Sequence, residues 1–173
     1  MRKPQFWLYY ILLVAAQIVI AASLNFSPLV TFWYLPMLVL CIPIRLGTSL
    51  TLIIAFVTGL AVDFLSQGVL GLTAASLLPV AFTKNLIIRL VFGSEVFSRG
   101  EDISVRRQGI PKMAIAIVMV TAIFLLVFIA ADGAGTRPFL FNLGRFSLSL
   151  LAGSVFSLIL VSIFDPGESS RWK

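Results

Sequence analysis

The chain has 173 residues, of which 60% are hydrophobic and 12% are charged, and its formal net charge is +6. A soluble domain carries about 25% charged residues, so a soluble fold this small could not bury so much apolar surface, whereas a bilayer accommodates it. The absence of histidine and the presence of a single cysteine exclude histidine-based zinc sites, histidine-containing catalytic triads and intrachain disulfides.

Six apolar runs follow one another along the chain, and each predicts a membrane helix. They cover residues 6–24, 29–44, 49–65, 69–92, 113–131 and 144–164. The first run is longer than the core of a signal peptide, so we expect a retained helix. The second contains Pro36 and Pro43, the fourth contains Pro79, and Pro111 enters the fifth. We therefore expect an all-α fold, a bundle of six transmembrane helices that forms one integral membrane domain over residues 1–173.

Basic residues are distributed unevenly over the ends of these helices. If the N-terminus is inside, the outer side holds only Arg137 and Arg145, and Lys84 lies within the fourth helix. The inner side holds Arg2, Lys3, Arg45, Arg89, Arg99, Arg106, Arg107, Lys112, Arg171 and Lys173. Because cytoplasmic loops are enriched in Lys and Arg, we expect both termini in the cytoplasm, and the net charge requires no nucleic-acid partner. The cytoplasmic loop 93–111 is expected to be either a short hairpin or interfacial segment, or a solvated charged linker.

Asp63 is the acidic residue to be explained, because it lies inside the outer end of the third helix, where a charge is costly without a partner. Arg145, which opens a helix, is the partner we favour. Arg137 and the free amides at residues 69–72 are the alternatives. Asp63 would then lock the hairpin; the other possibilities are an acid that reaches interfacial water and a ligand or ion site.

Small residues spaced four apart predict faces on which helix backbones approach closely. Such faces are Ala55 and Gly59 beside Asp63, then Gly71, Ala75, Pro79 and Thr83, and finally Ser149, Gly153 and Ser157. We expect most of them to pack within the bundle, although a partner's helix could use the same faces.

Three further polar residues lie within spans. Lys84 and Asn85 follow Pro79 in the fourth helix, and Gln17 lies in the first. We expect the Lys84 side chain to extend toward the cytoplasm, with an interior pocket as the alternative. The sequence has no nucleotide-binding loop, paired catalytic acids or activated nucleophile, so we expect no enzyme, no cofactor and no metal.

The stretch 58–72 resembles the signature hairpin of the rod shape-determining protein MreD family. That signature has a glycine, an aspartate four residues later, a glycine-bearing turn and a glycine that opens the next helix, here Gly59, Asp63, Gly68 and Gly71. The resemblance implies a non-enzymatic subunit of the bacterial cell-elongation complex in the inner membrane. It also implies binding to MreC and, through it, a connection of MreB filaments to RodA and a penicillin-binding transpeptidase.

The same resemblance implies a six-helix fold similar to that of the substrate-binding S-components of energy-coupling-factor transporters. The alternative function is a membrane subunit that binds a vitamin-type small molecule, which Pro36 and Pro79 fit because interrupted helices often line binding sites. That alternative predicts a closed polar cavity near the outer side, lined by Asp63, Arg145 or the loop 132–142. The scaffold hypothesis instead gives Asp63 a purely structural role.

Overall fold

A computed structural model of the chain describes residues 3–23, 33–67, 70–93, 109–132 and 139–163. The elements are α1 (Lys3–Ser23), α2 (Leu35–Cys41), a 3₁₀ turn η1 (Ile44–Leu46), α3 (Gly47–Val62), a π-helical turn η2 (Asp63–Gln67), α4 (Leu72–Phe92), α7 (Ile110–Asp132) and α8 (Phe139–Ile163). These residues contain no strand, as the all-α expectation requires. Most of the cytoplasmic loop 93–111, for which a hairpin or a linker was expected, lies outside the described residues.

Four helices are long and apolar enough to cross a membrane: 44–66, 72–92, 110–132 and 140–163. Each is at least 21 residues long, and about 20 residues are needed to cross the hydrocarbon core. A chain with four such segments is a membrane protein, because their outward side chains have no other apolar environment.

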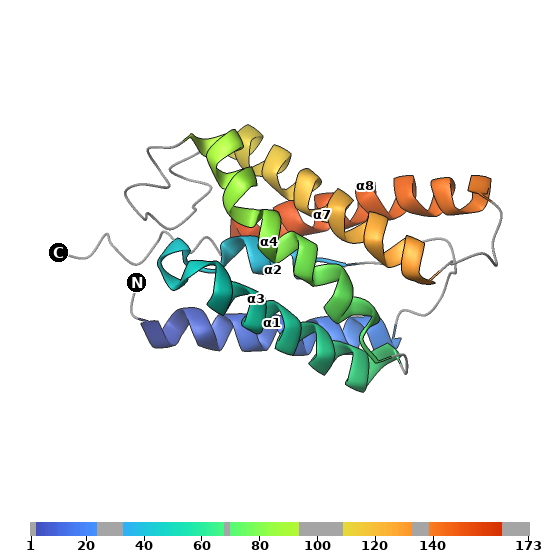
Figure 1. Ribbon diagram of the computed structural model, residues 1–173, viewed down its shortest axis with the longest axis horizontal. Coiled ribbons are helices and arrows are strands. Elements are labelled where there is room, and N and C mark those ends of the chain that lie inside the picture. The colour runs from blue at the N-terminus through green and yellow to red at the C-terminus, as the bar shows by residue number, and fades with distance from the viewer. Residues whose placement is uncertain (1–2, 24–32, 68–69, 94–108, 133–138, 164–173) are drawn as a thin grey trace.

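The helices run along the long axis of the molecule and form two antiparallel pairs (Figure 1). One pair is α3 and α4, and the other is α7 and α8, with α4 packed against α7 between them. Helix α1 lies beside α3, and the short α2 contacts α1, α4 and α7. The bundle is therefore organised around α4 and α2.

The prediction of one continuous helix over residues 29–44 was wrong. Of its described part, only Leu35–Cys41 is α-helical, and the side chains of residues 33–40 are all buried. Pro36 suits the first turn because it needs no donor there, whereas Pro43 forces Ile42 into an extended conformation with ψ of 134°. A helix of 7 residues is about 10 Å long, much shorter than the bilayer core. The prolines thus set both ends of an internal helix.

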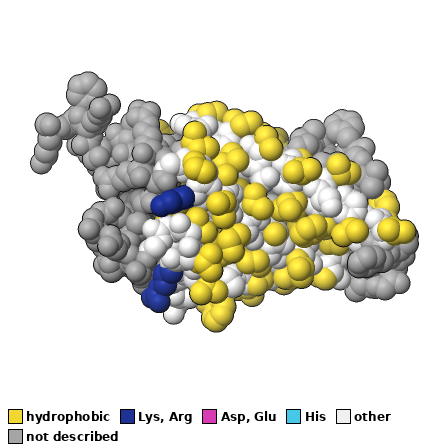
Figure 2. Space-filling model, turned by 90° about the horizontal axis from the view of Figure 1, so that it is seen from above, with side chains coloured by type: hydrophobic (Ala, Val, Ile, Leu, Met, Phe, Trp, Pro, Cys, Tyr) yellow, Lys and Arg dark blue, Asp and Glu magenta, His cyan; other side chains and the backbone are white. Residues whose placement is uncertain are grey.

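The buried and the lipid-facing sides of the bundle are both apolar. Leu77, Ile117 and Phe124 are fully buried, whereas Phe82 and Leu126 are 68% and 64% exposed. Figure 2 shows that hydrophobic side chains cover most of one face, with Lys and Arg side chains near one end. Such a surface requires an apolar solvent, which the bilayer supplies.

Candidate functional site

The Asp63 carboxylate is fully buried at the junction of α3 and α4. One of its oxygens, Oδ2, accepts hydrogen bonds from the backbone N–H groups of Gly71 at 3.0 Å, Thr73 at 3.0 Å and Ala74 at 3.2 Å. The other, Oδ1, is also 3.0 Å from the Thr73 nitrogen. Because the first N–H groups of a helix have no partner within it, Asp63 supplies the acceptors that the start of α4 lacks.

Two glycines give this hairpin its shape. Gly59 lets α3 contact the backbone of α4, since a Cβ there would lie 2.4 Å from the Ala74 Cα atom. Gly71 begins α4 with φ of +95°, which a residue with a side chain rarely adopts. Gly68, the third glycine of the predicted motif, lies outside the described residues. Gly59, Asp63 and Gly71 therefore act together to hold α3 against the first turn of α4.

The predicted ion pair between Asp63 and Arg145 was wrong. Arg145 is 6% exposed, and its guanidinium forms a salt bridge with Asp132 at the end of α7. Its Cζ atom also lies 5.9 Å from the centre of the Phe128 ring. Asp63 is satisfied by amides, so Arg145 is available to join α7 to α8. The alternative partner Arg137 lies outside the described residues.

The small-residue faces divide between the interior and the surface. Ala55, Ser149 and Ser157 are buried, and a Cβ on Gly153 would lie 3.1 Å from the Trp33 carbonyl oxygen. Their faces on α3 and α8 therefore serve contacts within the chain. Ala75, by contrast, is exposed, so it does not pack within the bundle, and a contact with a partner's helix stays a prediction. The buried side of α4 instead carries Thr73, Ala74, Ser76, Leu77, Val80, Ala81 and Lys84.

The expectation that Lys84 extends to the cytoplasm was also wrong. Its side chain is 1% exposed, and the ammonium donates to the carbonyl oxygen of Ile42, directly after α2. The physical reason is the short α2, which ends inside the bundle and brings the carbonyl of Ile42 beside α4. The neighbouring Asn85 donates to Thr48 Oγ1 at 2.8 Å and so connects α4 to α3.

Gln17 contributes to the other end of the α2 segment. It is fully buried, and its Oε1 atom accepts from the Tyr34 backbone N–H at 3.4 Å. The Tyr34 hydroxyl donates to the Leu13 carbonyl oxygen at 2.7 Å. These two contacts attach α1 to the residues that precede α2.

Sequence reasoning missed an aromatic cluster that joins the residues before α2 to α7 and α8. The Trp33 ring lies 5.7 Å from the Phe124 ring and 5.3 Å from the Phe128 ring, and the Tyr34 ring lies 5.6 Å from Phe156. The sequence feature that could have indicated this cluster is the adjacent pair Trp33 and Tyr34, shortly before Pro36. Aromatic residues are common in any membrane sequence, so this signal did not distinguish core from surface.

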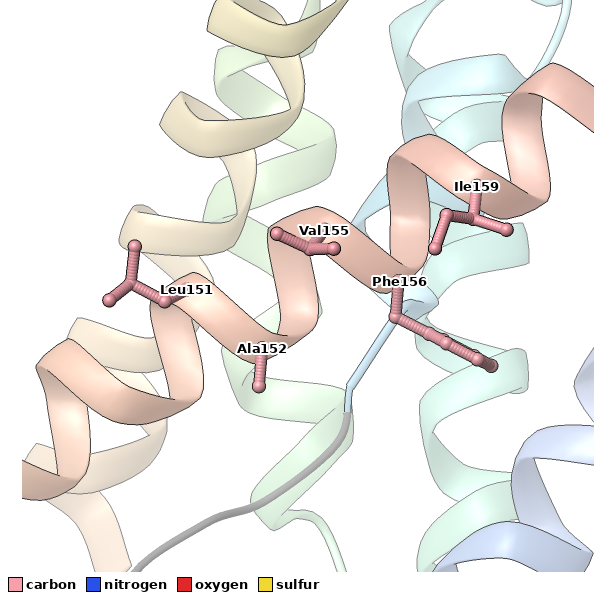
Figure 3. A pocket seen from close by; sticks show the side chains of 5 residues that line it. All are labelled: Leu151, Ala152, Val155, Phe156 and Ile159. Carbon is pink, nitrogen blue, oxygen red and sulfur yellow. The ribbon is translucent and has the colours of Figure 1, made fainter.

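The described surface offers little for binding a polar ligand. A shallow groove on α8 is lined by Leu151, Ala152, Val155, Phe156 and Ile159, all apolar (Figure 3). Among the described residues, no group of three or more His, Cys, Asp or Glu side chains could hold a metal. The chemistry of the Asp63 hairpin is hydrogen bonding to backbone amides, which fixes the geometry of two helices.

No family model, curated protein or solved structure matches the chain.

Proposed function

We propose that this chain is a non-enzymatic membrane scaffold of the bacterial cell-elongation complex. In this role it lies in the inner membrane, binds MreC and supports peptidoglycan synthesis and rod shape. Through MreC it is connected to MreB, RodA and a penicillin-binding transpeptidase. The proposal rests on the likeness of residues 58–72 to the MreD signature.

The observation that supports the proposal most directly is that the Asp63 carboxylate is bound by backbone amides. An acid that serves as a ligand site or a proton carrier needs an oxygen directed into a cavity or toward water. Here the carboxylate is 0% exposed and receives three backbone N–H groups. A motif whose described members hold two helices together supports a structural function more than a chemical one.

The proposed topology has six membrane crossings with both termini in the cytoplasm. Four crossings are the long apolar helices. The fifth is α1, which has 21 residues, and the sixth is the segment that contains α2. A crossing that is only partly helical is tolerated where protein surrounds it, and residues 33–40 are buried.

The transporter alternative is less well supported by the same geometry. It predicts a polar cavity lined by Asp63 or Arg145, yet Asp63 is bound to amides and Arg145 to Asp132. The described groove is lined by apolar side chains of α8 alone. Small-molecule sites in such proteins need several convergent polar groups.

The test is to purify the tagged chain from its native membrane in mild detergent and identify the proteins recovered with it. We expect a single-span protein with a periplasmic domain, together with cell-wall synthases. Recovery of an ATPase-coupled transporter core or of a bound vitamin would reject the scaffold role.

A matched pair of variants tests whether the shape of the Asp63 hairpin is needed for recovery of the partner. Gly59→Ala places a Cβ against the Ala74 backbone, whereas a Cβ on Gly144 has no atom within 4 Å. We expect Gly59→Ala to reduce recovery of the partner several-fold and Gly144→Ala to leave it unchanged. Equal recovery with both variants would mean that the hairpin shape is not needed for assembly.

A further inference from the structure

Two exposed cations lie where α4 ends and α7 begins. Arg89 is in the last turn of α4 and Lys112 is in the first turn of α7, and both side chains are exposed. Helices α4 and α7 pack against each other, and Figure 1 shows the end of α4 beside the start of α7. The two cations therefore lie at the same end of one helix pair.

Each cation is next to apolar side chains that face away from the bundle. On α4, Leu86 and Leu90 are 63% and 68% exposed. On α7, Ile110 and Ile115 are 65% and 54% exposed. Figure 2 shows Lys and Arg side chains at the edge of the hydrophobic surface, near one end of the molecule. A cationic group beside an apolar surface complements a phospholipid, which has an anionic phosphate at one end and acyl chains at the other.

The sign of the charge at this end selects the kind of lipid. In the described part of the chain, the carboxylates are Asp63 after α3 and Asp132 at the end of α7, both at the opposite end of the bundle. The segment 94–108 between the two helices has three acidic residues and three arginines, so it adds no net charge. A cation at the membrane surface increases the affinity for anionic lipid by about fivefold, and a zwitterionic headgroup lacks the net charge for this attraction.

We propose that the end of α4 and the start of α7 form a binding surface for an anionic phospholipid. Arg89 and Lys112 bind its phosphate, while the side chains of Leu86, Leu90 and Ile115 contact its acyl chains. Because the lipid contacts both helices, its binding stabilises the contact between α4 and α7 at this end. The scaffold function proposed above does not depend on this surface.

The test is a competition between two lipids with the same acyl chains, measured by native mass spectrometry of the purified chain in neutral detergent. Phosphatidylglycerol and phosphatidylcholine are added in equal amounts. We expect phosphatidylglycerol to be bound in about tenfold excess or more by the wild type. Lys112→Gln, at an exposed position, should reduce the excess by about fivefold. Arg89→Gln/Lys112→Gln should remove most of it and leave the thermal midpoint in phosphatidylcholine unchanged.

The matched control is Arg106→Gln/Arg107→Gln, which removes the same charge from the segment between the helices. We expect this control to keep the preference for phosphatidylglycerol. Three results would overturn the proposal. One is an equal loss of preference in both double variants, which would indicate attraction by net charge alone. Another is an unchanged preference in Lys112→Gln and in Arg89→Gln/Lys112→Gln. The third is displacement of phosphatidylglycerol by inorganic phosphate at millimolar concentration, which would indicate a site for a free anion.

Discussion

At the scale of the residue, Asp63 belongs to two helix ends with opposite electrostatic consequences. It follows the C-terminus of α3, where a negative charge is unfavourable, and it caps the N-terminus of α4, where the charge is favourable. Helix-end effects of about 0.3–1 kcal/mol are smaller than hydrogen bonds to a charged group, worth about 1.5–3 kcal/mol each. The amides of α4 therefore decide where the carboxylate lies.

Asp63→Asn should destabilise the protein without changing its fold. The substitution removes the charge and directs an NH₂ group or a weaker acceptor at three backbone donors, at a cost of about 1–3 kcal/mol. The thermal midpoint in detergent should therefore fall by roughly 2–10 °C. A wild-type midpoint and normal partner binding in Asp63→Asn would refute the structural role.

Gly59→Ala and Gly144→Ala should have opposite effects on stability. The first brings a Cβ within 2.4 Å of backbone, which cannot shift without separating α3 from α4. Such overpacking costs about 1–3 kcal/mol or more. The second adds a methyl group with no atom within 4 Å in a helix, where alanine is favoured over glycine by about 0.5–1 kcal/mol. Thermal unfolding of the two variants in one detergent measures the difference, and a destabilised Gly144→Ala would contradict it.

At the scale of the element, the sequence predicted the long helices well and α2 poorly. The runs 69–92 and 113–131 appear as α4 and α7 with ends displaced by three residues or fewer, because apolar length is a direct requirement of the bilayer. The run 29–44 has the same composition but lies within the protein. Hydropathy cannot distinguish these cases, since lipid and core are equally apolar. Lys84 was misplaced for the same reason, as its acceptor exists only because α2 is short.

The candidate site could be predicted in part from spacing. Gly59 lies on α3 and Asp63 one turn later, directly after it, which correctly places both on the side that faces α4. The partner of Asp63 could not be chosen, because backbone amides carry no sequence signal while Arg145 does. The exposed side of Ala75 could not be predicted, because a small residue on a membrane helix fits a lipid-facing side as well as a packed one.

The attachment of α1 to α3 rests on a hydrogen bond that a double-mutant cycle can measure. The hydroxyls of Tyr10 and Thr58 lie 2.9 Å apart in a buried position. Tyr10→Phe and Thr58→Val should each cost about 0.5–1.5 kcal/mol, and the double variant should cost less than the sum by about 0.5 kcal/mol or more. Strict additivity would mean that α1 is held by packing alone.

At the scale of the whole molecule, the described charges separate toward two ends. Arg45, Arg89 and Lys112 are exposed where α3 begins, α4 ends and α7 begins. These three points lie at one end of the bundle in Figure 1, and the Asp63 turn and the end of α7 lie at the other. A basic end matches the cytoplasmic side of an inner membrane. The charge pattern therefore predicts which end of the bundle faces the cytoplasm.

Cysteine labelling in intact cells tests both this orientation and the crossing by the segment that contains α2. In a Cys41→Ala background, single cysteines replace Ala22, Lys112 and Ala131, which are exposed near the ends of α1 and α7. We expect a membrane-impermeant maleimide to label Ala22→Cys and Ala131→Cys at once. Lys112→Cys should react only after permeabilisation, because the basic end is inside.

The pattern of failure distinguishes two errors in the topology. Immediate labelling of Lys112→Cys with protection of Ala131→Cys would mean that the whole bundle is inverted. Protection of Ala22→Cys alone would mean that the segment containing α2 does not cross, because Ala22 would then lie on the same side as the start of α3. If α1 still crosses, the number of crossings would then be odd, and the two termini would lie on opposite sides of the membrane.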